Sequence, residues 1–157
     1  MRTIGRFVAL AVLCASGPAL AAPTHISDPK AFVTQVYHRL ATDQNYTAPE
    51  DIYTAHLKAL FADEKHDAGD EVGRVDFDFW TDAQDWSLKD PKVREAPVEG
   101  NAGRKVEIVT FLNSDRPEEI HFYFQKTPAG WLLDDARSVK GESWTLSVIL
   151  KYGWDGQ

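Results

Sequence analysis

The chain has 157 residues, with 24 acidic and 17 basic side chains and a formal charge of −7. This acidic balance argues against nucleic acid or an anionic membrane as a partner, because both are bound through clustered Lys and Arg. The length suits a single domain with one hydrophobic core, and no linker, repeat or low-complexity tract interrupts residues 28–152.

Residues 1–21 have the pattern of a cleavable export signal. Arg2 and Arg6 precede an apolar run that is too short for a stable membrane span. In Ala19-Leu20-Ala21, small residues occupy the two positions that a signal peptidase recognises. We therefore predict cleavage after Ala21, a periplasmic or secreted location, and one domain over residues 22–157. No membrane insertion is expected after cleavage.

Removal of this leader takes away two of the 17 basic residues and the only cysteine, so the formal charge changes from −7 to −9. A domain without cysteine has no disulfides and must be stabilised by its core. An uncleaved membrane anchor and lipidation at Cys14 are the alternatives to cleavage. The strong acidity favours a small cationic ligand or a basic protein as the partner.

Two helical patterns come first in the domain. Asp28-Pro29 is a typical N-cap followed by a first helical residue, and apolar residues recur after it at helical spacing. Thr47-Ala-Pro-Glu50 is a capping-box pattern and predicts the start of a second helix. The apolar stripe of that second helix is Ile52, Tyr53, Leu57, Leu60 and Phe61.

Strand patterns follow. Residues 92–98, 104–113, 119–126 and 130–139 alternate or run apolar, and short turn-forming stretches separate them. Connections this short make neighbouring strands antiparallel, so we predict a four-stranded meander. A short helix capped by Ser143 and stopped by Gly153 closes the chain. Helices first and strands afterwards is an α+β pattern.

Four motifs together resemble a known family. They are Phe32-Val-x-x-Val-Tyr37, Asp76-Phe-Asp-Phe-Trp80 with Ala83-Gln-Asp85, Trp131-Leu-Leu-Asp-Asp135, and Trp144-Thr-Leu146. The chain resembles the family catalogued as domain of unknown function 3828, small exported bacterial proteins within the nuclear transport factor 2-like, or cystatin-like, superfamily. The resemblance implies a cone-shaped α+β fold, with N-terminal helices packed on a bent four-stranded antiparallel sheet, a short C-terminal helix, and a pocket at the wide end. It implies no particular activity.

Residues 76–86, the acidic–aromatic segment, are the strongest candidate for a site. They hold four carboxylates and four aromatic rings, and burial of the rings would bring the acids into a low-dielectric environment. If the segment is helical, Asp78, Asp82 and Asp85 lie on one face, and a cation, Arg137 or a donor-rich ligand would compensate their repulsion. The alternative is a solvated acidic face on which Asp78 caps a helix.

We select ten residues as candidates for binding a ligand or partner, without assigning any catalytic residue. From the acidic–aromatic segment and the strands they are Asp76, Asp78, Trp80, Gln84, Asp85, His121, Tyr123, Trp131, Asp134 and Arg137. His121 and Tyr123 share a strand face and would offer a proton carrier and a hydroxyl, unless that face is simply the polar outer side of the sheet. Of the adjacent Asp134 and Asp135, strand alternation lets only one face the hollow.

Metal and cofactor signals are weak. The five histidines show no zinc-binding spacing, and the sequence from Asp76 lacks the turn glycine and the bidentate glutamate of an EF-hand. Another calcium geometry remains an alternative at Asp76 and Asp78. No nucleophile or phosphate-loop motif is present, so we predict neither metal nor cofactor.

Three functions are compatible with these observations. The first is a non-catalytic periplasmic binding module for a cationic ligand or basic protein, for example an immunity or inhibitor protein. The second is a small enzyme that uses one pocket carboxylate with His121 or Tyr123 for proton transfer. The third is a structural envelope protein without a discrete ligand. The sequence does not indicate an oligomeric state.

Overall fold

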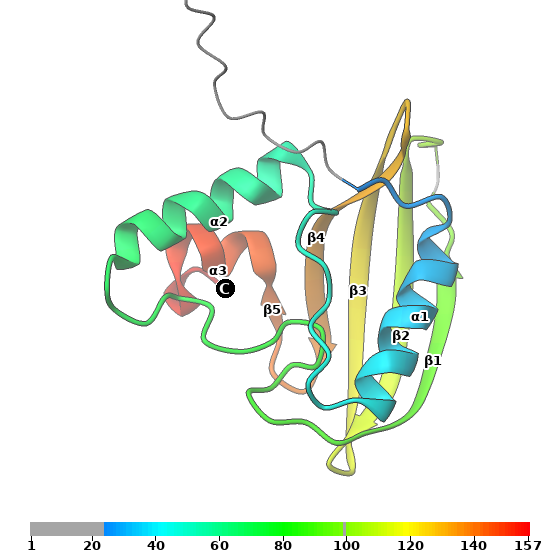
Figure 1. Cartoon of the computed structure of the whole chain (residues 1–157), viewed down its shortest axis with the longest axis horizontal. Coiled ribbons are helices and arrows are strands. Elements are labelled where there is room, and N and C mark those ends of the chain that lie inside the picture. Colours follow the sequence, from blue (N-terminus) through cyan, green and yellow to red (C-terminus); the bar gives the residue numbers. More distant parts are fainter. Residues whose placement is uncertain (1–23, 99) are drawn as a thin grey trace, which may run out of the picture.

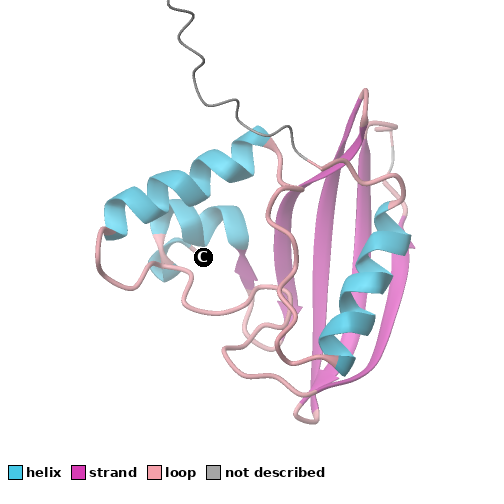
Figure 2. Cartoon of the chain, in the orientation of Figure 1, coloured by secondary structure: helices cyan, strands magenta, loops and turns pink. Residues whose placement is uncertain are grey.

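Helices pack on an antiparallel sheet of five strands in the computed structural model, which describes residues 24–98 and 100–157 (Figure 1). The predicted leader therefore lies outside the described residues. The elements in chain order are α1 (Pro29–Thr42), α2 (Ala55–Ala68), β1 (Leu88–Ala96), β2 (Arg104–Asn113), β3 (Arg116–Thr127), β4 (Gly130–Lys140), β5 (Trp144–Thr145), α3 (Leu146–Tyr152) and a final 3-10 turn (Trp154–Gly156). The α+β class is thus confirmed, with the sheet following the two N-terminal helices (Figure 2).

Helix α1 begins as the sequence predicts. Asp28 is the N-cap, its carboxylate accepts the Ala31 N–H at 3.3 Å, and Pro29 is the first helical residue. Its buried face is made of Val33, Val36, Tyr37 and Leu40, and α1 lies across β1 and β2 (Figure 1). Capping and an apolar stripe therefore suffice to specify this helix.

Helix α2 begins later than the capping-box pattern predicts, so that prediction is wrong. Thr54 is the N-cap, and its hydroxyl accepts the Leu57 N–H at 3.2 Å. The preceding residues pair with the sheet instead: the Leu133 N–H donates to the Ile52 carbonyl at 2.9 Å, and the Thr54 N–H donates to the Leu133 carbonyl at 2.8 Å. Backbone pairing with β4 replaces the expected first turns of the helix.

The sheet is a simple meander in the order β1-β2-β3-β4-β5, with each strand antiparallel to the next. The predicted bounds of β2 are confirmed, whereas β1 begins four residues earlier than predicted, at Leu88. The prediction of four strands is wrong, because Trp144–Thr145 pairs with Ser138 and Arg137 of β4 as a fifth strand. Consequently α3 starts at Leu146 rather than after Ser143, although it stops at Gly153 as predicted.

Both edges of the sheet are irregular. On the outer edge, β1 contains Pro91 and shifts register between Lys89 and Lys92. The other edge, β5, has only two residues. Neither edge therefore offers a long, uninterrupted strand.

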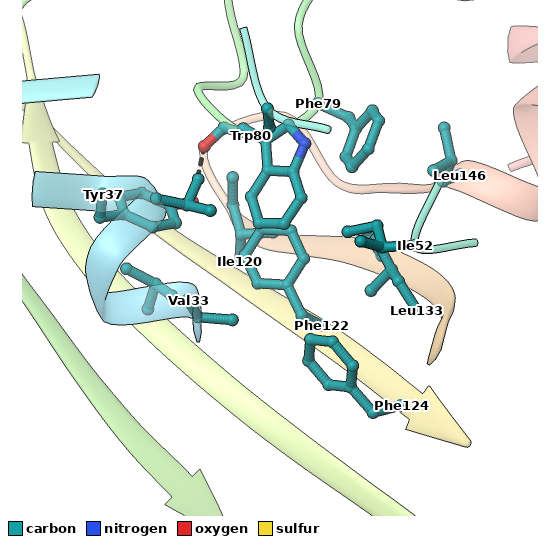
Figure 3. Close-up of a cluster of buried hydrophobic side chains, with 14 of the residues drawn as sticks. Val33, Tyr37, Ile52, Phe79, Trp80, Ile120, Phe122, Phe124, Leu133 and Leu146 are labelled. Atoms are coloured by element: carbon teal, nitrogen blue, oxygen red, sulfur yellow. Dashed lines mark hydrogen bonds between the residues drawn. The ribbon is translucent and has the colours of Figure 1, made fainter. Parts of the chain in front are cut away.

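The main core fills the inner face of the sheet, defined as the face toward α1. Trp80 lies at its centre and stacks on Phe122 with ring centroids 4.5 Å apart (Figure 3). The hydroxyl of Tyr37 on α1 donates to the Trp80 carbonyl at 2.5 Å. The acidic–aromatic segment thus connects α2 to β1 while part of it is buried between α1 and the sheet. In the described part of the chain, every helix is too short or too polar to cross a bilayer.

Candidate functional site

The acidic–aromatic segment forms a tight turn and not a helix. The Asp78 N–H donates to the Ala83 carbonyl at 3.0 Å, and the Asp78 carboxylate accepts the Trp80 N–H at 2.8 Å. Asp82 has a positive φ of 54°, and Asp85 is exposed beyond the turn. The three aspartates therefore do not share one face, and the conditional prediction of an acidic helix face is wrong.

A cleft of about 1090 Å³ opens between α2 and two flanking segments. Its walls come from residues 47–53, which precede the helix, from residues 58–68 on the helix, and from residues 69–80, which follow it. Aromatic rings make part of its floor: Tyr53 stacks on Phe61 at 5.4 Å, and Phe79 lies 6.4 Å from each of them. The cleft is larger than two other concave features of the described residues, which have volumes of about 230 and 690 Å³.

Three polar residues, Glu50, Tyr53 and Asp78, line the end of the cleft nearest the start of α2. The Tyr53 side chain is only 6% exposed, and its hydroxyl makes no hydrogen bond to any described residue. Burial raises the pKa of Tyr53 well above its usual value, and the nearby carboxylates of Glu50 and Asp78 raise it further. The hydroxyl therefore stays neutral beside two acids and offers both a donor and an acceptor to the cleft.

Asp78 is the most perturbed acid in the cleft. Its side chain is half-buried, and burial raises its pKa above the usual value although the Trp80 N–H opposes this by stabilising the charged form. One carboxylate oxygen is taken by that N–H, and the other has no partner among the described residues. Asp78 thus has a free acceptor in a poorly solvated position.

The charge lining the cleft is strongly negative. Its acids are Glu50, Asp51, Glu64, Glu71, Asp76 and Asp78, and its bases are Lys58 and Lys65. None of the six carboxylates forms an ion pair within residues 24–98 and 100–157. Within the same residues, Asp51 and Glu64 accept hydrogen bonds from Thr24 and from the Arg74 N–H, so a positively charged group entering the cleft would find free acceptors mainly on Glu50, Glu71, Asp76 and Asp78.

Four of the ten residues selected from the sequence line this cleft: Asp76, Asp78, Trp80 and Gln84. Trp80 is 3% exposed and contributes mainly to the core. Asp85, from the same segment, is exposed and does not line it.

The structure places the strand candidates elsewhere. Tyr123, Asp134 and Arg137 line a shallow groove of about 230 Å³ on the outer face of the sheet. His121 is on the same face, where its Nε2 lies 2.7 Å from a Glu119 carboxylate oxygen. Their neighbour Phe122 faces the core, so strand alternation turns His121 and Tyr123 away from the cleft. They cannot serve as its proton carrier and hydroxyl.

One expectation about β4 needs correction. The register shifts at Asp134, and Asp134 and Asp135 both line the outer groove, because a bulge removes the alternation on which the prediction depended. Trp131 is buried near the strand end, with the ammonium groups of Lys105 and Lys126 5.7 and 5.8 Å from its ring centroid. Asp134, Asp135 and Trp131 therefore do not line the cleft.

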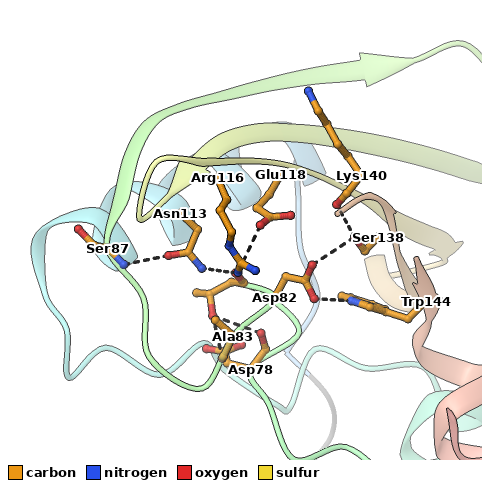
Figure 4. Close-up of polar contacts among 11 residues, drawn as sticks. Asp78, Asp82, Ala83, Ser87, Asn113, Arg116, Glu118, Ser138, Lys140 and Trp144 are labelled. Carbon is orange, nitrogen blue, oxygen red and sulfur yellow. Dashed lines mark hydrogen bonds and ion pairs between the residues drawn. The ribbon is translucent and has the colours of Figure 1, made fainter. Parts of the chain in front are cut away.

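A second pair of acids, Asp82 and Glu118, lies where the turn at residues 78–83 meets the sheet (Figure 4). The Asp82 carboxylate accepts hydrogen bonds from the Trp144 indole N–H and, at 3.4 Å, from the Ser138 hydroxyl. Glu118, 3% exposed, lies 3.5 Å from the Arg116 guanidinium. Burial raises the pKa of both Asp82 and Glu118 above their usual values. We interpret the Asp82 contacts as a structural anchor that fixes the turn, because Trp144 and Ser138 supply the donors, whereas Glu118 Oε2 is buried without a hydrogen-bond partner among the described residues.

Reasoning from the sequence missed Glu50 and Tyr53. The capping-box interpretation assigned Glu50 to a helix terminus and Tyr53 to an apolar stripe, which left no polar role for either. The available signal was the tyrosine hydroxyl itself, because a tyrosine in a buried stripe needs a partner for its polar end.

Within the described residues, no three His, Cys, Asp or Glu side chains converge as a metal ion requires. Comparisons of the chain with protein-family models, with curated proteins and with solved structures found no match. The site must therefore be interpreted from its own geometry.

Proposed function

We propose that the protein is a non-catalytic binding module whose cleft takes an organic cation, carried by a small molecule or by a basic partner protein. The observation that carries the proposal is the group formed by Tyr53, Glu50 and Asp78 at one end of the cleft. The neutral hydroxyl of a largely buried tyrosine and two carboxylates without an ion-pair partner among the described residues match an ammonium or guanidinium group, and the neighbouring rings suit its apolar body.

The proposal includes the family and location that the sequence indicates. We place the chain in the cone-shaped nuclear transport factor 2-like fold and in the domain of unknown function 3828 family. The order of elements, two helices followed by an antiparallel meander and a short helix, supports this placement. The leader pattern in residues 1–21 supports export to the periplasm or beyond. A basic toxin neutralised by an immunity or inhibitor protein would be one such partner.

The test compares benzylamine with benzyl alcohol, which has a similar shape but no charge. Trp80 lines the cleft, so tryptophan fluorescence reports on occupancy. We expect saturable binding of the amine alone. We expect Asp78→Asn to weaken it by roughly 10- to 150-fold, since a charge-assisted hydrogen bond contributes about 1.5–3 kcal/mol. Asn keeps an acceptor for the Trp80 N–H, so the turn is preserved.

Asp85→Asn is the matched control, because it removes a carboxylate from the same segment but outside the cleft. Its affinity for the amine should equal that of the wild type. Equal binding of the amine and the alcohol, or no difference between Asp78→Asn and Asp85→Asn, would show that the cleft does not recognise positive charge.

A small enzyme of the same fold type is the second candidate, and the raised pKa of Asp78 favours it. In that case Asp78 would exchange a proton with the bound molecule, with Tyr53 as the neighbouring hydroxyl. Mass spectrometry of the amine after prolonged incubation separates the two functions: recovery of the unchanged compound favours a binding module, and conversion that Asp78→Asn abolishes favours an enzyme.

A further inference from the structure

The cleft is elongated along α2. Lys58, Phe61, Lys65 and Ala68 line it, at positions i, i+3, i+7 and i+10 of one helix face. Ten residues of helix span about 15 Å at 1.5 Å per residue. Figure 1 shows the chain after α2 turning back beside the helix, and this returning segment makes the opposite wall. The cleft is therefore a groove, whose volume of about 1090 Å³ exceeds what a single ammonium group fills.

Acidic groups occur at both ends of the groove. Glu50 and Asp78 line the groove with Tyr53 near the start of α2, whereas Glu71 lines the groove after the helix has ended at Ala68. The carbonyl end of α2 adds partial negative charge beside Glu71. A ligand that neutralises both ends must carry positive charges separated by roughly the length of the groove.

Apolar side chains lie between these ends. Phe61, Val75 and Phe77 line the middle of the groove and are only partly buried. Such surfaces accept the aliphatic stems of lysine or arginine while the charged heads reach the carboxylates. The alternation of acid, apolar surface and acid is complementary to a chain with regularly spaced basic side chains.

We infer that the occupant is an extended basic segment of a partner protein, about four or five residues long. The length follows from about 15 Å of groove and about 3.3 Å per extended residue. The inference rests on the proposed cation-binding function and adds to it the class of ligand and its direction along α2. Six carboxylates against two lysines supply the charge complementarity. Tyr53 is 6% exposed, and its hydroxyl has no hydrogen-bond partner among the described residues, so it marks the end that is built for a polar group.

The experiment measures binding by calorimetry for four probes. These are an acetylated and amidated pentapeptide in which lysine alternates with alanine, the same peptide with glutamine in place of lysine, acetyl-lysine amide, and spermidine. We expect the lysine pentapeptide to bind at least a hundredfold more tightly than acetyl-lysine amide, because contacts at both ends act together. The glutamine peptide should not bind.

Two variants locate the contacts. Glu71→Gln, at an exposed position, should weaken the lysine pentapeptide about fivefold and leave acetyl-lysine amide unchanged, whereas Asp78→Asn should weaken both. Asp85→Asn should alter neither. This pattern is specific to a ligand that spans the groove.

Each other outcome overturns a defined part of the reasoning. If acetyl-lysine amide binds as tightly as the pentapeptide, the cleft takes one cation, so the inference fails and the proposed function stands. If spermidine matches the pentapeptide, the occupant is a free polyamine and the peptide assignment is wrong. If none of the cationic probes binds, both the inference and the proposed function fail.

Discussion

Glu107 lies on the inner face of β2 and is completely buried, and neither carboxylate oxygen has a hydrogen-bond partner among the described residues. Glu95 of β1 is directly opposite in the strand register, and its own carboxylate is held by Lys105 at 2.7 Å. Burial raises the pKa of Glu107 to about 7, and Glu95 and Asp28 raise it while Lys105 and Lys30 lower it. Glu107 is therefore a protonated acid below neutral pH.

The consequence for stability has a definite sign. The folded pKa of about 7 compares with an ordinary value of 4.5, and a difference of about 2.5 pH units corresponds to about 3 kcal/mol. Because the folded state holds this proton more tightly than the unfolded state, the free energy of unfolding falls as the pH rises from about 4.5 to about 7. The loss is nearly complete above about pH 8.

Glu107→Gln removes this titration and keeps the size of the side chain. We expect the free energy of unfolding of the variant, relative to the wild type, to increase by about 3 kcal/mol between pH 4 and pH 8. Urea unfolding followed by tryptophan fluorescence at pH 4, 5, 6, 7 and 8 measures it. Asp63→Asn, on the exposed side of α2, is the matched control and should follow the wild-type curve. Parallel curves for the wild type and Glu107→Gln would refute the reasoning.

Two other predictions concern the turn. Tyr37→Phe deletes the hydroxyl that donates to the Trp80 carbonyl, so the free energy of unfolding should fall by about 1–2 kcal/mol. The control is Tyr123→Phe, which removes a hydroxyl that bonds no described residue and should change the free energy of unfolding by less than about 0.5 kcal/mol. Equal effects of the two substitutions would contradict a stabilising role for the Tyr37 hydrogen bond. Trp144→Phe should lower the free energy of unfolding by about 2–4 kcal/mol. The loss should be larger at pH 7 than at pH 4, because the indole N–H stabilises the charged form of Asp82. Urea unfolding at both pH values measures this, and a loss that does not depend on pH would point to packing alone.

Local patterns in the sequence predicted the bounds of some helices and strands correctly. The cap at Asp28 fixed the start of α1, and the alternating pattern of residues 104–113 fixed the bounds of β2. The errors occur where distant backbone groups compete. The capping box at residues 47–50 was outweighed by hydrogen bonds between residues 52–54 and Leu133, about 80 positions away. Such a pairing leaves no periodic signature in a segment of three residues.

The same limit applies to the site. Composition was enough to select Asp76 and Asp78, because acids next to large rings are unusual. It did not indicate that α2 would form the opposite wall, or that Tyr53 would lie at the end of the groove. His121 was selected with Tyr123 because the two share a strand face, and the structure shows the alternative interpretation, in which this face is the polar outer side of the sheet. Which carboxylate faces a cleft depends on the path of the whole chain.

The irregular edges of the sheet have a consequence for self-association. A long, regular edge strand is a template on which another chain can add its backbone, and this is a common start of fibril growth. Here Pro91 and the register shift interrupt one edge, and the other extends for two residues only. A concentrated solution of the folded protein should therefore resist ordered aggregation through its sheet, because neither edge presents a long, uninterrupted run of free backbone.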